Sequence, residues 1–259
     1  MKRIFSYLLV LIFVLLTFRG TANPLVDKLQ CKFYKAFVTG EMGEWPDWMS
    51  MLEKEYNRSG DEDVLYELVL AHYGYVAYLI GIESEDKAKK YLQQGRKYNE
   101  ILSRSEYYKS HAQAFEGAFL GYEIGMNKAK AVFLGPKSMK HINRAVEMNP
   151  YNPNVWVEKG NATFHIPKMF QGSFSEAARY FEKAVDYFEI SERKTSCNWL
   201  YLNALAWLAR SYDKAEDLKK AYDTYQKILR IEPDFSWVKN ELYPEFMEDH
   251  DIADLSAKE

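Results

Sequence analysis

The chain has 259 residues, a formal net charge of −3 and 16% aromatic residues, with 13 Gly, 8 Pro and 2 Cys. This composition excludes collagen-like, disulfide-rich and simply disordered chains. Charged residues make up 27% of the sequence and its one long apolar run lies at the N-terminus, which excludes a protein with several membrane spans. The near-neutral charge balance argues against nucleic-acid binding, because contact with the phosphate backbone needs clustered Lys and Arg.

Residues 1–22 have the pattern of a signal peptide. Two basic residues precede an uncharged apolar run over residues 4–18, and small residues follow at 20–22. This run is shorter than the about 20 residues that a spanning helix needs. We therefore expect export to a periplasmic or secreted location, with cleavage before Asn23. The alternative is membrane anchoring by an uncleaved N-terminal helix, because Arg19 directly follows the run.

From residue 24 to about 240 the sequence predicts one helix after another. Apolar residues recur three and four positions apart, and clusters of Gly, Pro, Asn and Ser separate the apolar segments. About ten helices result. Ser173, followed three residues later by Glu176, has the pattern of a capping box at a helix start. The stretch 131–137 contains Gly and Pro and is interpreted as a lengthened turn.

Two stretches of the chain carry a more specific pattern. Over residues 202–233 the spacing follows W-x2-L-G-x2-Y, then A-x3-F, then P, which is the tetratricopeptide helix-turn-helix. The matching residues are Leu205, Leu208, Ala209, Tyr212, Ala221, Tyr225, Ile228 and Pro233, and in the preceding unit Trp156, Gly160, Ala177 and Phe181. The chain therefore resembles a tetratricopeptide repeat (TPR) protein of the exported bacterial type, most clearly over residues 134–233.

The resemblance implies an all-α fold, a right-handed superhelical solenoid of antiparallel helix pairs over residues 23–240. In such an array no unit buries its own apolar face, and stability accumulates as neighbouring units stack. The acidic segment 241–259 is predicted to be a disordered tail. Cys31 and Cys197 are predicted to be free thiols, because opposite ends of a linear array lie farther apart than the about 7 Å between Cα atoms that a disulfide allows.

The resemblance also implies a concave groove lined by the first helix of each unit, where polar side chains hold an extended peptide. By that pattern the candidate groove residues are Asn154, Asn161, His165, Asn203 and Arg210. The alternative is that these are ordinary solvated positions.

The connection 164–172 is longer than the family pattern requires. Its Met169 and Phe170, with His165, are candidates for a rim loop that contacts a ligand. The alternative, which we favour, is a hydrophobic plug on the edge of the array, because exposed apolar residues more often cover a core than bind a ligand.

The sequence contains no recognised catalytic, phosphate-binding or metal-binding motif, and its five His residues are scattered along the chain. We therefore expect a non-enzymatic scaffold for protein-protein interaction. It holds a protein or peptide partner in the groove, binds no cofactor, metal or nucleic acid, and has no membrane span after signal cleavage. The alternative is a ligand-binding accessory protein of an envelope transport or assembly system, in which aromatic side chains enclose a small molecule. A hydrolase is a third hypothesis, disfavoured by the lack of a recognisable nucleophile and base.

Overall fold

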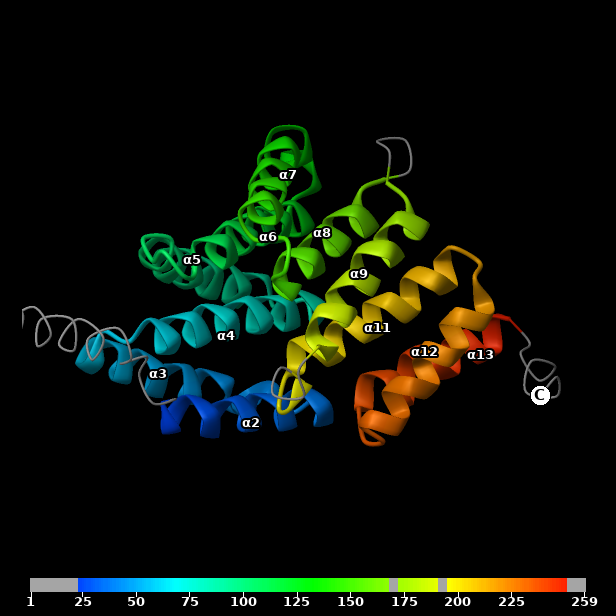
Figure 1. Ribbon diagram of the computed structural model, residues 1–259, viewed down its shortest axis with the longest axis horizontal. Helices are drawn as coiled ribbons and strands as arrows, with labels where there is room; N and C mark the ends of the chain where they lie inside the picture. The colour runs from blue at the N-terminus through cyan, green and yellow to red at the C-terminus, as the bar shows by residue number, and fades with distance from the viewer. Residues whose placement is uncertain (1–22, 168–171, 191–194, 251–259) are drawn as a thin grey trace, which may run out of the picture.

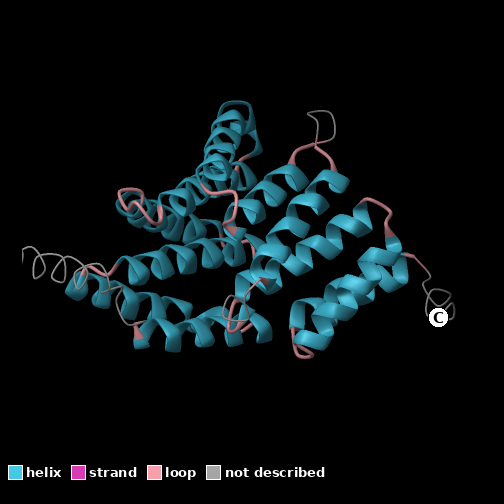
Figure 2. Cartoon of the chain, viewed as in Figure 1, coloured by secondary structure: helices cyan, strands magenta, loops and turns pink. Residues whose placement is uncertain are grey.

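The computed structural model describes residues 23–167, 172–190 and 195–250. In these ranges the protein is all-helical and the helices pack against their neighbours, which confirms the predicted all-α class (Figure 1, Figure 2). The α-helices are α2 (Pro24–Thr39), α3 (Trp45–Ser59), α4 (Glu62–Gly81), α5 (Glu85–Leu102), α6 (Lys109–Met126), α7 (Ala131–Met148), α8 (Pro153–His165), α9 (Phe174–Glu189), α11 (Trp199–Lys214), α12 (Leu218–Ile231) and α13 (Tyr243–Asp249). Two short 3-10 helices, η1 (Met42–Glu44) and η2 (Lys128–Lys130), and a π-helical turn, η4 (Val238–Leu242), complete the described elements.

Local sequence signals explain the hairpin of α8 and α9. The Ser173 hydroxyl accepts a hydrogen bond from the backbone N–H of Glu176 at 3.2 Å, which confirms the predicted helix start. A Cβ atom added at Gly160 would lie 2.8 Å from the Phe181 ring, so only glycine lets the two helices approach this closely. The small-residue position in the sequence pattern is therefore a packing requirement.

Helices that are consecutive in the chain form the main packing pairs: α4 with α5, α6 with α7, α8 with α9, and α11 with α12. Contacts of α6 with α4 and with α8, and of α9 with α11, join these pairs into a row (Figure 1). Helix α4 is the one described helix that is long and apolar enough to cross a membrane, but 72% of that stretch is buried inside the protein. Helix α4 is accordingly a core helix of the protein.

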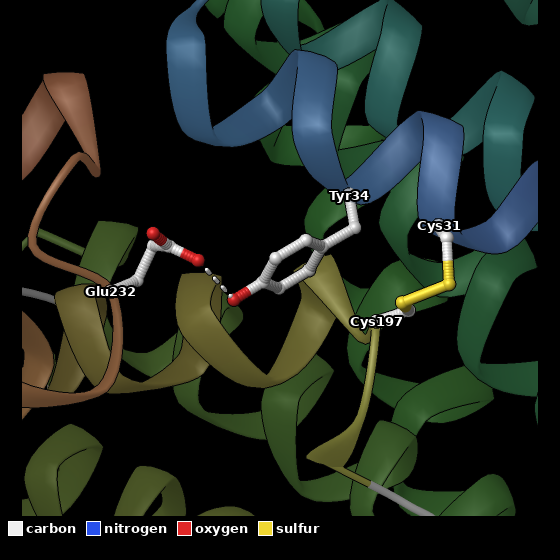
Figure 3. Close-up of a disulfide and its surroundings, with 4 residues drawn as sticks. All are labelled: Cys31, Tyr34, Cys197 and Glu232. Atoms are coloured by element: carbon white, nitrogen blue, oxygen red, sulfur yellow. Dashed lines mark hydrogen bonds between the residues drawn. A yellow bond between two sulfur atoms is a disulfide. The ribbon is translucent and has the colours of Figure 1, made fainter.

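Helix α2, the first described helix, also packs against a helix far along the chain. It packs against both α4 and α11, and a disulfide joins Cys31 on α2 to Cys197 just before α11, with 4.7 Å between the Cα atoms (Figure 3). On the next turn of α2 the Tyr34 hydroxyl donates a hydrogen bond to Glu232 Oε2 at 2.9 Å. One turn further along, the Phe37 ring lies 5.5 Å from the ring of Trp199.

The prediction of free thiols at Cys31 and Cys197 is therefore wrong. It assumed a straight row in which these residues lie at opposite ends. The row instead bends, so that α2 returns to the start of α11 and the two Cα atoms come within disulfide range (Figure 1).

Two further predictions fail in part. The stretch 131–137 is not a turn, because α7 runs through it with Pro136 inside the helix. Proline there leaves the Val132 carbonyl without its helical donor, but Val132 is 76% exposed and water reaches this turn. The acidic segment is ordered as far as residue 250: Phe246 is 2% exposed and packs against Tyr225, with 5.3 Å between ring centroids. Residues 251–259 and the predicted signal peptide lie outside the described residues.

Changing Cys31 to Ser is expected to lower the thermal midpoint. The disulfide spans a sequence separation of 166 residues. Loss of such a cross-link raises the entropy of the unfolded chain, which lowers the free energy of unfolding by about 5 kcal/mol in the chain-entropy model. Circular dichroism melts with and without reductant measure the effect. The wild type should melt lower in reductant and the C31S variant should not respond; a wild type indifferent to reductant would contradict the cross-link.

Candidate functional site

A cavity of about 250 Å³ lies beside the disulfide, where the N-terminal helices meet the start of α11. We call it the polar pocket. Its described lining residues come from α2, α4, α6, α8, α9 and the segment that leads into α11: Gln30, Tyr66, Glu67, Leu70, His111, Asn152, Pro153, Asn154, Phe188, Ser196, Cys197, Asn198, Trp199 and Leu200. The closure of α2 onto α11 thus creates a chamber to which both halves of the chain contribute.

Glu67 is the buried acid of this pocket, with 1% of the residue exposed on the core helix α4. Its Oε2 atom accepts a hydrogen bond from Gln30 Nε2 at 3.0 Å. Burial raises the pKa of Glu67 to about 7, and the bond from Gln30 only partly offsets this. At neutral pH the carboxyl group therefore exchanges readily between its neutral and ionised forms.

His111 and Trp199 contribute buried polar atoms that the protein leaves unpaired. Burial lowers the pKa of His111 to about 4, so its ring is neutral at physiological pH. Within the described residues, neither Nδ1 of His111 nor Nε1 of Trp199 has a hydrogen-bond partner, and Trp199 is 4% exposed. Such unpaired atoms are rare in folded proteins, and here two of them belong to residues that line one pocket.

The structure uses two of the predicted groove residues internally. Asn154 Nδ2 donates to the Tyr66 hydroxyl at 2.6 Å, and Asn161 Nδ2 donates to the Tyr73 hydroxyl at 3.2 Å. Both tyrosines belong to α4, so the chain's own core helix engages the polar side chains predicted to hold a peptide backbone. Asn154 lines the polar pocket, whereas Asn161 does not appear among its lining residues.

The other predicted groove residues lie on α8 and α11 around Trp207. The His165 ring lies 5.2 Å from the Trp207 ring, and the Arg210 guanidinium carbon lies 4.6 Å from it on the same helix. Desolvation lowers the pKa of His165, and the positive charge of Arg210 lowers it further. Asn203 lies one turn before Trp207 and is half-buried. We call His165, Trp207 and Arg210 the Trp207 cluster; the rim candidates Met169 and Phe170 lie outside the described residues.

A second cavity, of about 660 Å³, lies between α5 and the end of α6. Its charged side chains neutralise one another: Arg96 binds Glu116 and Glu123, and Lys130 Nζ binds Glu123 at 2.9 Å. These groups are satisfied without a ligand. The polar pocket is smaller, yet two of its lining residues carry buried polar atoms that are unpaired among the described residues, and it is therefore the stronger candidate site.

The described polar side chains of the pocket are not linked to one another as a catalytic set. Glu67 bonds to Gln30, and His111 has no carboxylate partner on its Nδ1 atom, so the described residues form no hydrogen-bonded set of nucleophile, base and orienting group here. In the described part of the chain no group of three or more His, Cys, Asp or Glu side chains is placed to hold a metal ion.

Sequence analysis missed the residues that make the polar pocket polar, chiefly Glu67, Gln30 and His111. One signal was available: Glu67 is the single charged residue in the apolar stretch 64–80. A charge inside a core helix needs a partner or a function. The other residues carry no comparable mark, because they come together only through the closure of α2.

The sequence matches no model of a known protein family and no curated protein.

Changing Glu67 to Gln is expected to raise stability at pH 8 and to leave it nearly unchanged at pH 4.5. The pKa in the folded protein, about 7, lies above the ordinary 4.5. Ionising Glu67 in its buried position therefore lowers the free energy of unfolding. This loss is absent below pH 4.5, grows as the pH rises to 7 and is complete above pH 7, where it reaches up to about 3 kcal/mol. The amide oxygen of the substituted side chain still offers Gln30 an acceptor.

Urea unfolding at both pH values measures the difference. The control is Glu100→Gln on the exposed face of α5, where the side chain is 76% exposed. Equal effects of E67Q at pH 4.5 and pH 8 would show that Glu67 ionises normally in the folded protein.

Proposed function

We propose that the protein is an exported, non-enzymatic binding protein whose helix pairs form a TPR-like right-handed superhelix closed by α2. The contacts of α4 with α6 and of α6 with α8 support stacked pairs, because these are the first helices of successive pairs. The disulfide between Cys31 and Cys197 supports export, since structural disulfides persist in oxidising compartments such as the periplasm or the extracellular space. The signal pattern in residues 1–22 agrees with it.

The function that the geometry supports best is capture of a small molecule in the polar pocket. The observation that carries it is that two residues with unpaired buried atoms among the described residues, His111 and Trp199, line the same cavity as the buried acid Glu67. Such a pocket with convergent polar groups and perturbed pKa values is the usual form of a ligand site. This corresponds to a ligand-binding accessory role in an envelope transport or assembly system.

A second candidate is a scaffold that binds a protein or peptide partner. The Trp207 cluster favours it, because a half-buried Trp stacked with Arg is typical of interaction hot spots. Val132 and Phe133 at the start of α7 add exposed apolar surface, at 76% and 74% exposure. Peptide binding along Asn154 and Asn161 is less favoured, since α4 already occupies both side chains.

The export proposal predicts that the chain isolated from its native cell begins at Asn23. Intact-mass and N-terminal peptide measurements, with thiols alkylated before reduction, test this directly. Cys31 and Cys197 should resist alkylation until reductant is added. A full-length N-terminus together with two free thiols would contradict export.

Small-molecule capture predicts that at least one compound of a polar metabolite panel raises the thermal midpoint in a saturable manner. Changing Ser196, an exposed residue lining the pocket, to Trp should abolish the shift by obstructing the pocket. The matched control is Ser103→Trp at the exposed end of α5, which should keep it.

The two candidate functions give different outcomes in this experiment. If no compound stabilises the protein, the small-molecule function fails. A protein partner that crosslinks to the wild type in its native cell, and not to a Trp207→Ala variant, would then favour the scaffold.

A further inference from the structure

The described lining of the polar pocket has one charge-bearing acid and no Lys or Arg. His111, a second titratable group of the lining, stays neutral because burial holds its pKa at about 4. An anionic ligand would therefore meet the Glu67 carboxyl without a compensating cation. A cationic ligand would supply a positive partner for Glu67, since among the described residues the one donor that reaches it is the neutral amide of Gln30.

Aromatic side chains surround the same space. Tyr66, Phe188 and Trp199 all line the pocket, and their π-faces attract organic cations, most strongly where water is excluded. Trp199 and Tyr66 are held in place from behind: Trp199 packs on Gly74, where an added Cβ would lie 2.7 Å from the indole, and Asn154 fixes the Tyr66 hydroxyl. The pocket is thus preorganised around its acid.

Trp199 adds a second requirement on the ligand. Its Nε1–H is a donor only, and it has no acceptor among the described residues. A ligand oxygen would satisfy it, whereas a purely hydrocarbon amine would leave it unpaired and would bind more weakly for that reason. His111 Nδ1 can accept from a ligand N–H or O–H group, depending on its tautomer.

We propose that the polar pocket binds a small organic ammonium compound that also carries a hydroxyl or carbonyl oxygen, with the ammonium group on Glu67 and the oxygen on Trp199 Nε1. This inference rests on the proposed function, small-molecule capture. The volume of about 250 Å³ limits the ligand to a compact aliphatic amine rather than a nucleotide or an oligosaccharide.

Three compounds of equal heavy-atom number separate the two requirements. 4-Amino-1-butanol has both the ammonium and the hydroxyl group, pentylamine has the ammonium group only, and 1,4-butanediol has hydroxyl groups only. Titration calorimetry on the mature, oxidised protein at pH 8 should show the tightest binding for 4-amino-1-butanol. Pentylamine should bind about 5-fold or more weaker, and 1,4-butanediol should not bind below about 10 mM.

Two substitutions assign the contacts. Glu67→Gln should weaken both amines at least about 10-fold, while Glu100→Gln on exposed α5 should change nothing. Trp199→Phe keeps an aromatic face and removes Nε1–H, so it should weaken 4-amino-1-butanol and leave pentylamine unchanged. Thermal melts report whether each variant is folded, and the comparison of the three compounds on the wild type stands without either variant.

Failure of this inference is distinguishable from failure of the proposed function. Equal binding of 1,4-butanediol and 4-amino-1-butanol, or unaltered amine binding by E67Q, would overturn the ammonium class. If a neutral metabolite binds and Ser196→Trp abolishes its binding, small-molecule capture survives and only the ligand class is wrong. Absence of binding by every compound refutes both.

Discussion

The packing of α2 against α11 is the constraint on which the rest of this protein depends. The disulfide from Cys31 and the hydrogen bond from Tyr34 to Glu232 lie on successive turns of α2 (Figure 3). The ring contact of Phe37 with Trp199 lies on the turn after them. One helix thus makes a covalent, a polar and an apolar contact with distant parts of the chain. Because the partners lie far away in the sequence, these contacts fix how the row of helix pairs bends, and the bend places Gln30 of α2 beside Glu67 of α4.

The bend also determines where polar side chains are buried. In an open array the first helices of successive pairs would present their polar residues to solvent or to a peptide. Here α4 and α8 face each other, and Tyr66 and Tyr73 take the amide donors of Asn154 and Asn161. The two tyrosines are seven residues apart on α4, and the two asparagines are seven residues apart on α8. Seven residues make about two helical turns, so the two hydrogen bonds repeat along the same faces of the two helices. The polar face predicted for a partner thus becomes an internal contact.

Local features of the fold could be predicted from the sequence, and long-range ones could not. The Ser173 cap, the glycine that fits against Phe181 and the end of α12 before Pro233 depend on residues close in sequence or within one hairpin. The disulfide depends on the sum of many small rotations between helices, which no local pattern reports. For the same reason the sequence pattern found Asn154, a pocket residue, but assigned it to a peptide groove, and it missed His111 and Trp199.

Two buried acids whose pKa burial raises, Glu67 and Glu158, help to explain why the polar pocket is the site that we propose. The carboxyl of Glu158, on α8, accepts hydrogen bonds from the Tyr73 hydroxyl of α4 and from Asn161 Nδ2, the latter at 3.5 Å. Glu158 lines neither of the two cavities described above. Burial raises the pKa of Glu158 to about 7, as it does for Glu67. The carboxyl of Glu158 is nevertheless enclosed by protein donors. Among the described residues Glu67 has one amide donor and lines a cavity that His111 and Trp199 also line, so of these two acids Glu67 is the one that borders space for a ligand.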